Sequence, residues 1–207
     1  MNHEPFVHRF EPAPAGASDG TLLLLHGTGG NENDLLPLGR AIAPHAALLS
    51  PRGQVLEHGM PRFFRRLAEG VFDHDDLVAR TGQLTTFVRE SAAEHGFDVE
   101  RVVAVGFSNG ANIAAAMMFL HPELLAGAIL LRPMVPFVAE QLPSLAGRRV
   151  LVAAGRSDPI VPARQSEVLA EMMRQAGADV TLHWSPGAHG LERADVAAAT
   201  AWWTAGR

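Results

Sequence analysis

The hydrophobic positions of this chain form two kinds of run. Six short runs are mostly continuously apolar: residues 21–25, 46–49, 101–105, 128–131, 150–153 and 180–184. A strand that is buried on both faces has this pattern, because helices cover both sides of a parallel sheet. The runs therefore predict the strands of a mostly parallel central sheet.

The segments between these runs have the periodicity of helices: residues 33–43, 75–95, 109–120, 163–175 and 191–205. Asp34, Asp75 and Asp76 lie near predicted helix starts, where negative charge suits the helix dipole. Gly96 and Gly177 lie where C-terminal caps are expected. The alternation predicts an α/β fold with right-handed crossovers and helices on both faces of the sheet. Ligands of such sheets bind beyond the carboxyl ends of the strands, so we expect the functional residues in the loops that follow strands.

Composition narrows the class of protein. The chain has 207 residues, of which 47% are apolar and 19% charged, and this is an ordinary globular composition. The length is typical of one domain, which we place at residues 1–207. The net charge of −5 argues against nucleic acid or an anionic membrane as a partner, because both favour a basic face.

The chain contains no cysteine, which excludes disulfides, thiolate metal sites and a cysteine nucleophile. Its first residues are polar and rich in Pro and Gly, without the apolar run of a secretory signal. The longest strongly apolar stretch, residues 113–120, is too short to span a membrane. These features fit a protein of the reducing cytoplasm without stable membrane association.

A candidate nucleophile follows the predicted strand 101–105. Residues 106–110 read Gly-Phe-Ser-Asn-Gly and lead into a predicted helix, which is the context that a Gly-x-Ser-x-Gly turn requires. Such a sharp turn lifts the hydroxyl of Ser108 clear of the sheet, and Gly106 and Gly110 let the strand and helix backbones pass closely. The alternative is a glycine-flanked serine in an ordinary tight turn.

A serine hydroxyl needs a base, and the base needs an orienting carboxylate, in the chain order Ser, Asp or Glu, His. Asp158 lies in the loop after the predicted strand 150–153, whereas Asp179 opens a strand and lies at the opposite edge. The alternative role for Asp158 is that of a turn or cap residue.

Three histidines follow Ser108 in the chain. His121 lies at a predicted helix end, and His183 lies within the last predicted strand, facing a helix or solvent. His189 lies in the loop after that strand, on the expected edge of the sheet, and is therefore the candidate base. The alternative is a surface loop histidine.

An oxyanion hole needs a second backbone donor from the loop after an earlier strand. Residues 26–31, His-Gly-Thr-Gly-Gly-Asn, follow the predicted strand 21–25, and their glycines let backbone amides turn inward. We assign the hole to the backbone N–H groups of Thr28 and Asn109. The loop lacks the lysine of a phosphate-binding P-loop and the glycine spacing of a dinucleotide site.

These segments together carry a family resemblance that covers nearly the whole chain. Residues 25–32, 106–110, 155–162 and 189–190 resemble the phospholipase/carboxylesterase family of the α/β-hydrolase superfamily. The family pattern implies Ser108, Asp158 and His189 as the triad, and a homodimer is plausible in this family. Thioesterase members usually carry Gln at the position of Asn109, whereas the Gly-Thr-Gly-Gly-Asn-Glu segment looks like the bacterial carboxylesterase branch.

The spacing of the predicted elements leaves no room for an inserted lid domain. We therefore expect a serine carboxylesterase that acts on small to medium acyl or aryl esters. An acyl thioesterase or lysophospholipase is the alternative enzyme, and a ligand receptor on a hydrolase scaffold is the alternative outside enzymes. In the irregular stretch 50–73, Phe63 and Phe64 either line an apolar substrate pocket, to which we also assign Met134, or pack in the core under the loop.

Other features carry less weight. Arg62, Arg65 and Arg66 either meet an anionic substrate or form a solvated basic turn. Residues 73–76, Asp-His-Asp-Asp, favour a helix N-terminus over a metal site, and we expect no metal and no cofactor. Of the adjacent Trp202 and Trp203, one is expected in the core and the other at a surface that could form a dimer contact.

Overall fold

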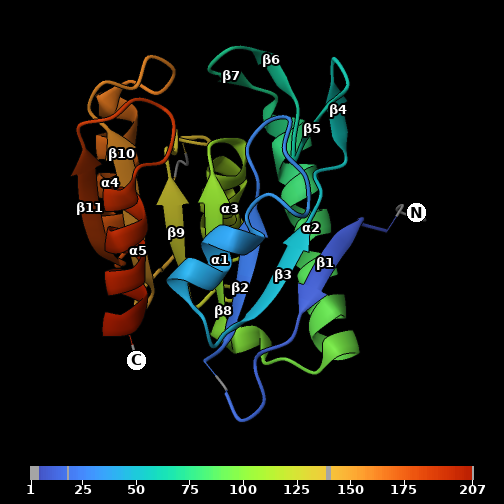
Figure 1. Cartoon of the computed structure of the whole chain (residues 1–207). Helices are drawn as coiled ribbons and strands as arrows, with labels where there is room; N and C mark the ends of the chain where they lie inside the picture. Colours follow the sequence, from blue (N-terminus) through green and yellow to red (C-terminus); the bar gives the residue numbers. More distant parts are fainter. Residues whose placement is uncertain (1–4, 18, 139–140, 207) are drawn as a thin grey trace.

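A seven-stranded sheet forms the centre of the molecule in the computed structural model, which describes residues 5–17, 19–138 and 141–206 (Figure 1). The strand order is β1-β3-β2-β8-β9-β10-β11. The strands are β1 (His8–Glu11), β2 (Thr21–Leu25), β3 (Ala47–Pro51), β8 (Val102–Phe107), β9 (Gly127–Leu131), β10 (Arg149–Gly155) and β11 (Asp179–Ser185). Only the edge strand β1 runs antiparallel to its neighbour. The predicted parallel sheet is therefore confirmed.

Helices cover both faces of this sheet. On one face lie α1 (Leu36–Ile42) and α5 (Arg193–Ala205), and on the other lie α2 (His74–His95), α3 (Asn109–Leu120) and α4 (Ala163–Gln175) (Figure 1). Successive strand residues alternate between the faces: Leu23 packs with α2 and α3, whereas Leu22 and Leu24 pack with α1 and α5. Because both sides are buried, the central strands β2, β3, β8, β9 and β10 are apolar at nearly every position, which explains their continuous hydrophobic runs.

The helix boundaries agree with the sequence except at two N-termini. The predicted helix 33–43 begins three residues later, as α1, because Asn31 and Asp34 form a local turn in which Asn31 N–H donates to Asp34 Oδ2 at 3.0 Å. The last helix begins at Arg193, where Glu192 and Asp195 form a capping box. Asp73 caps α2 by accepting the N–H of its first turn, so the acidic run 73–76 is a helix start, as predicted.

The sequence did not reveal the edge strand or two small hairpins. These hairpins are β4 (Val55–Glu57) with β5 (Met60–Arg62), and β6 (Arg66–Ala68) with β7 (Val71–Phe72). They occupy the stretch 50–73, which the sequence had marked only as irregular, and they stand above the carboxyl end of the sheet (Figure 1). Among the described residues, no helix is long and apolar enough to cross a membrane.

The arginines of this stretch differ in exposure: the Arg65 side chain is 61% exposed, as in the solvated role considered for it, whereas Arg62 fits neither role. Arg62 is 3% exposed and pairs with Glu57 at 3.3 Å, so it is neither solvated nor free to meet a substrate. Arg66 also pairs with Glu57, at 2.8 Å, and Arg65 pairs with Asp73 at 3.0 Å. These ion pairs hold the hairpins together and give each of the three arginines a carboxylate partner.

Trp202 and Trp203 correct another expectation. Both are 8% exposed and pack in the core cluster between α5 and the sheet. Consecutive helix residues are about 100° apart around the axis, but the core between α1, α5 and the sheet is wide enough to bury both. A dimer contact therefore does not rest on either tryptophan.

Candidate active site

Ser108 occupies a sharp turn between β8 and α3. Its backbone has φ 52°, in the left-handed region that is unusual for a residue with a side chain. Its N–H donates to Leu131 O at 2.9 Å, which holds the turn against the neighbouring strand. A side-chain carbon at Gly106 would overlap the backbone of Gly110, and one at Gly110 would overlap the Leu25 carbonyl. Both glycines are therefore required by close backbone packing, and the serine is held above the sheet.

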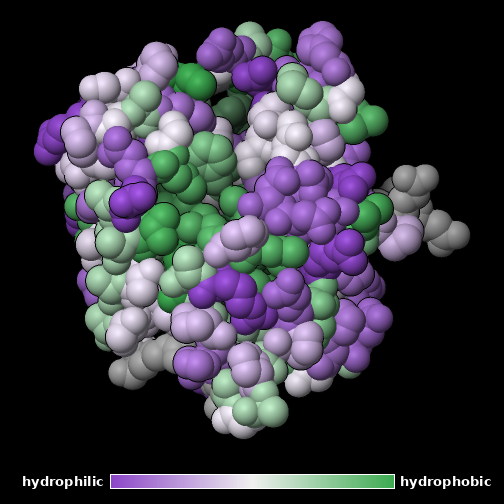
Figure 2. Space-filling view, viewed as in Figure 1, coloured by the Kyte–Doolittle hydropathy of each residue, from purple (hydrophilic) through white to green (hydrophobic). Residues whose placement is uncertain are grey.

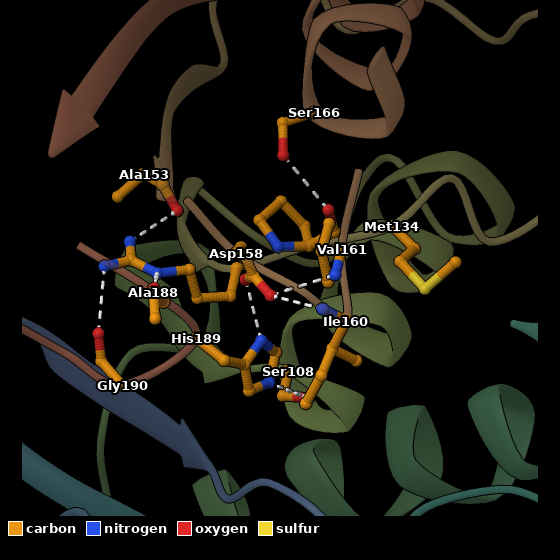
Figure 3. Close-up of polar contacts among 12 residues, drawn as sticks. Ser108, Met134, Ala153, Asp158, Ile160, Val161, Ser166, Ala188, His189 and Gly190 are labelled. Atoms are coloured by element: carbon orange, nitrogen blue, oxygen red, sulfur yellow. Dashed lines mark hydrogen bonds and ion pairs between the residues drawn. The ribbon is translucent and has the colours of Figure 1, made fainter. Parts of the chain in front are cut away.

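His189 lies between Ser108 and Asp158 (Figure 3). Its Nε2 is 2.9 Å from Ser108 Oγ, and its Nδ1 is 2.8 Å from Asp158 Oδ2. Because the ionised carboxylate only accepts hydrogen bonds, Nδ1 carries the proton and Nε2 presents its lone pair to the serine hydroxyl. The structure thus brings together the three residues that the sequence singled out from three separate loops.

Asp158 is fixed by the loop that carries it. Its Oδ1 accepts the N–H groups of Ile160 at 2.8 Å and Val161 at 3.0 Å, and its side chain is 1% exposed. Burial alone would raise the pKa of Asp158, but hydrogen bonds from Val161, His189 and Ile160 outweigh it and lower the pKa. The carboxylate therefore stays ionised beside the imidazole.

The loops that carry the acid and the histidine are joined directly. Ser157 N–H donates to Gly187 O at 3.1 Å. A side-chain carbon at Gly155 would lie 2.5 Å from Ala188 O, so only glycine lets the two backbones approach this closely. The other histidines stand apart: His183 faces α5, with Nε2 3.5 Å from Asp195, and His121 is the C-cap of α3.

The loop after β2 is organised around His26. Its Nδ1 is 2.7 Å from Gly27 O, and its Nε2 accepts the Gly53 N–H at 3.0 Å. Since Nε2 accepts, Nδ1 carries the proton and donates to the Gly27 carbonyl. Burial lowers the pKa of His26 by more than the hydrogen bond to Gly27 raises it, so the imidazole stays neutral.

Contacts with β5 fix the next residues of this loop. Arg62 Nη1 donates to Thr28 Oγ1 at 2.6 Å, and Gly29 N–H donates to Pro61 O at 2.9 Å. Sequence reasoning missed this role of Arg62, because a charged residue in an irregular stretch gives no signal of burial. The hairpin β4–β5 thus holds the glycine-rich loop in place.

The two candidate oxyanion donors lie on adjacent segments. The loop 26–31 approaches the turn at Ser108 so closely that a side-chain carbon at Gly27 would lie 2.9 Å from the Phe107 ring. Among the residues that the structure describes, neither the Thr28 nor the Asn109 N–H donates to a protein acceptor. Asn109 also begins α3, where the first N–H groups have no partner within the helix.

The three candidate pocket residues differ in exposure. Phe63 and Phe64 are 2% and 0% exposed and lie in the core, which is the second of the two roles considered for them. The Phe63 ring packs 4.7 Å from the His26 ring, centre to centre, and so contacts the start of the glycine-rich loop. Met134 is half-buried and lies near the triad (Figure 3). Its Cε lies beside Gly70 of the hairpin β6–β7, where an added Cβ would be 3.6 Å away.

The depressed pKa of His26 predicts how stability depends on pH. In the unfolded chain His26 takes up a proton near its ordinary pKa of 6.5, whereas in the folded protein it resists protonation. Its contribution to stability is therefore full above pH 6.5 and falls as the pH drops below that value. We expect His26→Gln to flatten the dependence of the free energy of unfolding on pH below 6.5, measured by urea denaturation.

His45→Gln, which removes an exposed imidazole, is the matched control for this experiment. The role assigned to His26 is wrong if its replacement leaves the same slope of unfolding free energy against pH as the wild-type protein.

The sheet order, the helices on both faces and the serine turn after β8 define the α/β-hydrolase fold. Residues 12–202 match the sequence model of one family of this fold, which is described as Phospholipase/Carboxylesterase. The chain belongs to the phospholipase/carboxylesterase family.

Individual relatives agree with this assignment. A Bacillus subtilis (strain 168) protein named "Putative hydrolase MhqD" is 52% identical over 188 residues, which are 91% of this chain and 94% of the relative. The crystal structure of the Bacillus cereus carboxylesterase matches with a TM-score of 0.94 at 49% identity, covering 96% of this chain and 93% of that one. A carboxylesterase from Mesorhizobium loti matches with a TM-score of 0.84 at 31% identity, covering 93% and 98%. The chain is therefore an ester-hydrolysing enzyme.

Proposed function

We propose that this enzyme hydrolyses carboxylic esters with small to medium acyl or aryl groups, through an acyl-enzyme formed on Ser108. The observation that carries the proposal is the hydrogen-bonded series from Asp158 through His189 to Ser108, with distances of 2.8 and 2.9 Å. This arrangement supplies a nucleophile, a base and an orienting carboxylate in one line.

Acylation begins when Ser108 Oγ attacks the ester carbonyl carbon while its proton passes to His189 Nε2. The carbonyl π electrons move to oxygen, and the resulting oxyanion accepts hydrogen bonds from the N–H groups of Thr28 and Asn109. Asp158 holds the imidazole in the required tautomer and stabilises the imidazolium. When the tetrahedral intermediate collapses, the bond from the acyl carbon to the ester oxygen breaks, and His189 gives its proton to the departing alkoxide, which leaves as the alcohol.

Deacylation repeats these steps with water as the nucleophile. His189 removes a proton from water, the hydroxide adds to the acyl carbon, and the same two N–H groups bind the oxyanion. Collapse then breaks the bond to Ser108 Oγ, which recovers its proton from His189 and releases the carboxylic acid. The half-buried serine and the histidine, whose side chain is 18% exposed, are accessible to substrate and to water.

Apolar side chains around the serine favour an uncharged acyl or aryl group. Ile160 is 44% exposed beside Asp158, and Met60 is 41% exposed against the glycine-rich loop. Met134, which is half-buried, lies on the same side of the triad as Ile160 and Val161 in Figure 3. Figure 2 shows apolar surface gathered on the left half of this face, between α5 and α1, and reaching up toward the loops above the sheet. Since the hairpin arginines Arg62, Arg65 and Arg66 are paired with carboxylates, a hydrophobic substrate is the better match.

The proposal is tested by intact-mass measurement after reaction with a fluorophosphonate probe. We expect one adduct on the wild-type protein, because Ser108 Oγ displaces fluoride from phosphorus, and none on Ser108→Ala. Ser144→Ala removes an exposed loop serine and should be labelled like the wild type. A folded wild-type protein without an adduct would contradict the proposal and favour a ligand receptor on a hydrolase scaffold.

A series of p-nitrophenyl esters from acetate to laurate, compared with acyl-CoA thioesters of the same lengths, then measures the substrate preference. We expect the highest kcat/KM for short and medium esters. Preference for long chains or for thioesters would instead identify a lysophospholipase or an acyl thioesterase.

A further inference from the structure

Arg132 follows β9, the strand between those that carry Ser108 and Asp158. Its backbone adopts φ 57°, and its N–H donates to Ala153 O of β10 at 2.8 Å. The preceding Leu131 carbonyl accepts the N–H of Ser108 at 2.9 Å. The residue therefore stands between the loop of the nucleophile and the loop of the acid, and the left-handed backbone turns its side chain into the protein.

The guanidinium of Arg132 holds the loop of the catalytic base from both sides. Its Nε donates to Ala188 O at 3.1 Å, and its Nη2 donates to Gly190 O at 3.1 Å (Figure 3). These two carbonyls directly flank His189 in the chain. The backbone on either side of the imidazole is thus tied to a single planar group.

The remaining donors of the guanidinium are also engaged. Nη1 donates to Ala153 O at 3.2 Å, and Nη2 donates to Ser185 Oγ at 3.0 Å. Asp195 forms a bidentate pair with the two terminal nitrogens, at 3.1 and 2.6 Å, and also accepts the Glu192 N–H at 2.8 Å. Both charges are buried, since the side chains of Arg132 and Asp195 are 0% and 1% exposed. The guanidinium is therefore fixed by the end of β11 and by the first turn of α5.

A buried ion pair is a poor device for stability alone, because the loss of hydration offsets much of the attraction between the charges. A guanidinium is well suited to holding two carbonyls at a set spacing, because its donors form a rigid planar fork that a lysine ammonium lacks. This rigidity matters for His189, which must keep Nδ1 on Asp158 and Nε2 on Ser108 at the same time.

We propose that Arg132, balanced by Asp195, is a positioning residue that keeps His189 aligned between Ser108 and Asp158. The inference rests on the proposed function, because alignment matters only if His189 is the base. Misplacement of a reacting group by about 1 Å can lower the rate about 100-fold. Ground-state binding of the substrate does not involve Arg132, so kcat should fall while KM is retained.

The test compares Arg132→Lys with Arg149→Lys. Arg149 is the matched control, because its guanidinium packs on Trp202 and donates to the Trp202 carbonyl at 3.2 Å, away from the His189 loop. We expect Arg132→Lys to lower kcat and the rate of fluorophosphonate labelling by about 100-fold with KM changed less than about threefold. Arg149→Lys should have wild-type values.

Proton NMR supplies a measurement that needs no turnover. The His189 Nδ1 proton, shared with Asp158, should give a low-field resonance in the wild-type and Arg149→Lys proteins, and Arg132→Lys should lose or shift it. Wild-type kcat together with an unchanged resonance in Arg132→Lys would overturn the inference. A wild-type protein that the fluorophosphonate does not label would instead overturn the proposed function. In that case the resonance would still show whether Arg132 aligns His189 with Asp158.

A second variant separates alignment from stability. Replacing a buried ion pair by apolar residues of similar volume is often neutral or stabilising, so Arg132→Met combined with Asp195→Leu should fold even if the lysine variant does not. We expect this double variant to melt cooperatively and still to show the lowered kcat. Wild-type kcat in the double variant would overturn the inference, because its guanidinium is absent.

Discussion

Ser108→Ala is expected to lower kcat by about 10⁶-fold, to a residual rate that the oxyanion donors and substrate binding still support. The hydroxyl removed is the only atom that forms the covalent bond to the acyl group in the proposed mechanism. The turn itself should persist, because its geometry depends on the Ser108 N–H bond to Leu131 and on the glycines at 106 and 110.

This result is measured as kcat for p-nitrophenyl butyrate, with the thermal midpoint of unfolding as a check on the fold. Ser144→Ala, the exposed loop variant, should keep wild-type kcat. A Ser108→Ala protein that retains more than about a hundredth of the wild-type kcat would contradict the role of the serine as nucleophile.

Asp158→Asn is expected to lower kcat by about 10⁴-fold without changing the shape of the site. Asp158 Oδ1 faces two N–H donors, those of Ile160 and Val161, so the asparagine must turn its carbonyl oxygen toward them. Its NH₂ group then faces His189 Nδ1 and donates to it. The imidazole proton consequently moves to Nε2, where it points at Ser108 Oγ and removes the lone pair that the base needs.

The matched control for this variant is Asp98→Asn. Like Asp158, Asp98 accepts the N–H of the residue two positions later in the chain, which here is Glu100 at 2.9 Å. Asp98 instead caps the short helix η1 (Val99–Arg101). This variant should keep wild-type kcat. If Asp158→Asn keeps kcat within tenfold of wild type, Asp158 is only a cap of its loop, which was the alternative considered from the sequence.

The central strands could be predicted from the sequence because both faces of the sheet are covered, which leaves continuous apolar runs. The edge strand β1 could not, because His8–Glu11 is short and largely polar, and its place depends on pairing with β3. The hairpins β4–β5 and β6–β7 are too short to show a periodicity.

The candidate site was found from chain order and from the position of each residue after a strand. Arg132 could not be found in this way, because its partners Ala188, Gly190 and Asp195 lie 56, 58 and 63 positions further along the chain. Arg62 was missed for a related reason, since its role depends on its bond to Thr28, 34 positions earlier in the chain. Long-range contacts of this kind leave no mark on local sequence patterns.

The packing of α1 against α5 has a consequence for how the protein folds. Thr200 Oγ1 of α5 donates to Ala41 O of α1 at 3.4 Å, across 159 positions of the chain, and Ser108 meets His189 across 81. Contacts between residues so far apart form slowly, because the chain loses loop entropy before it gains contact energy. Recovery of esterase activity during refolding should therefore lag behind helix formation, so that turnover reports the last stage of folding.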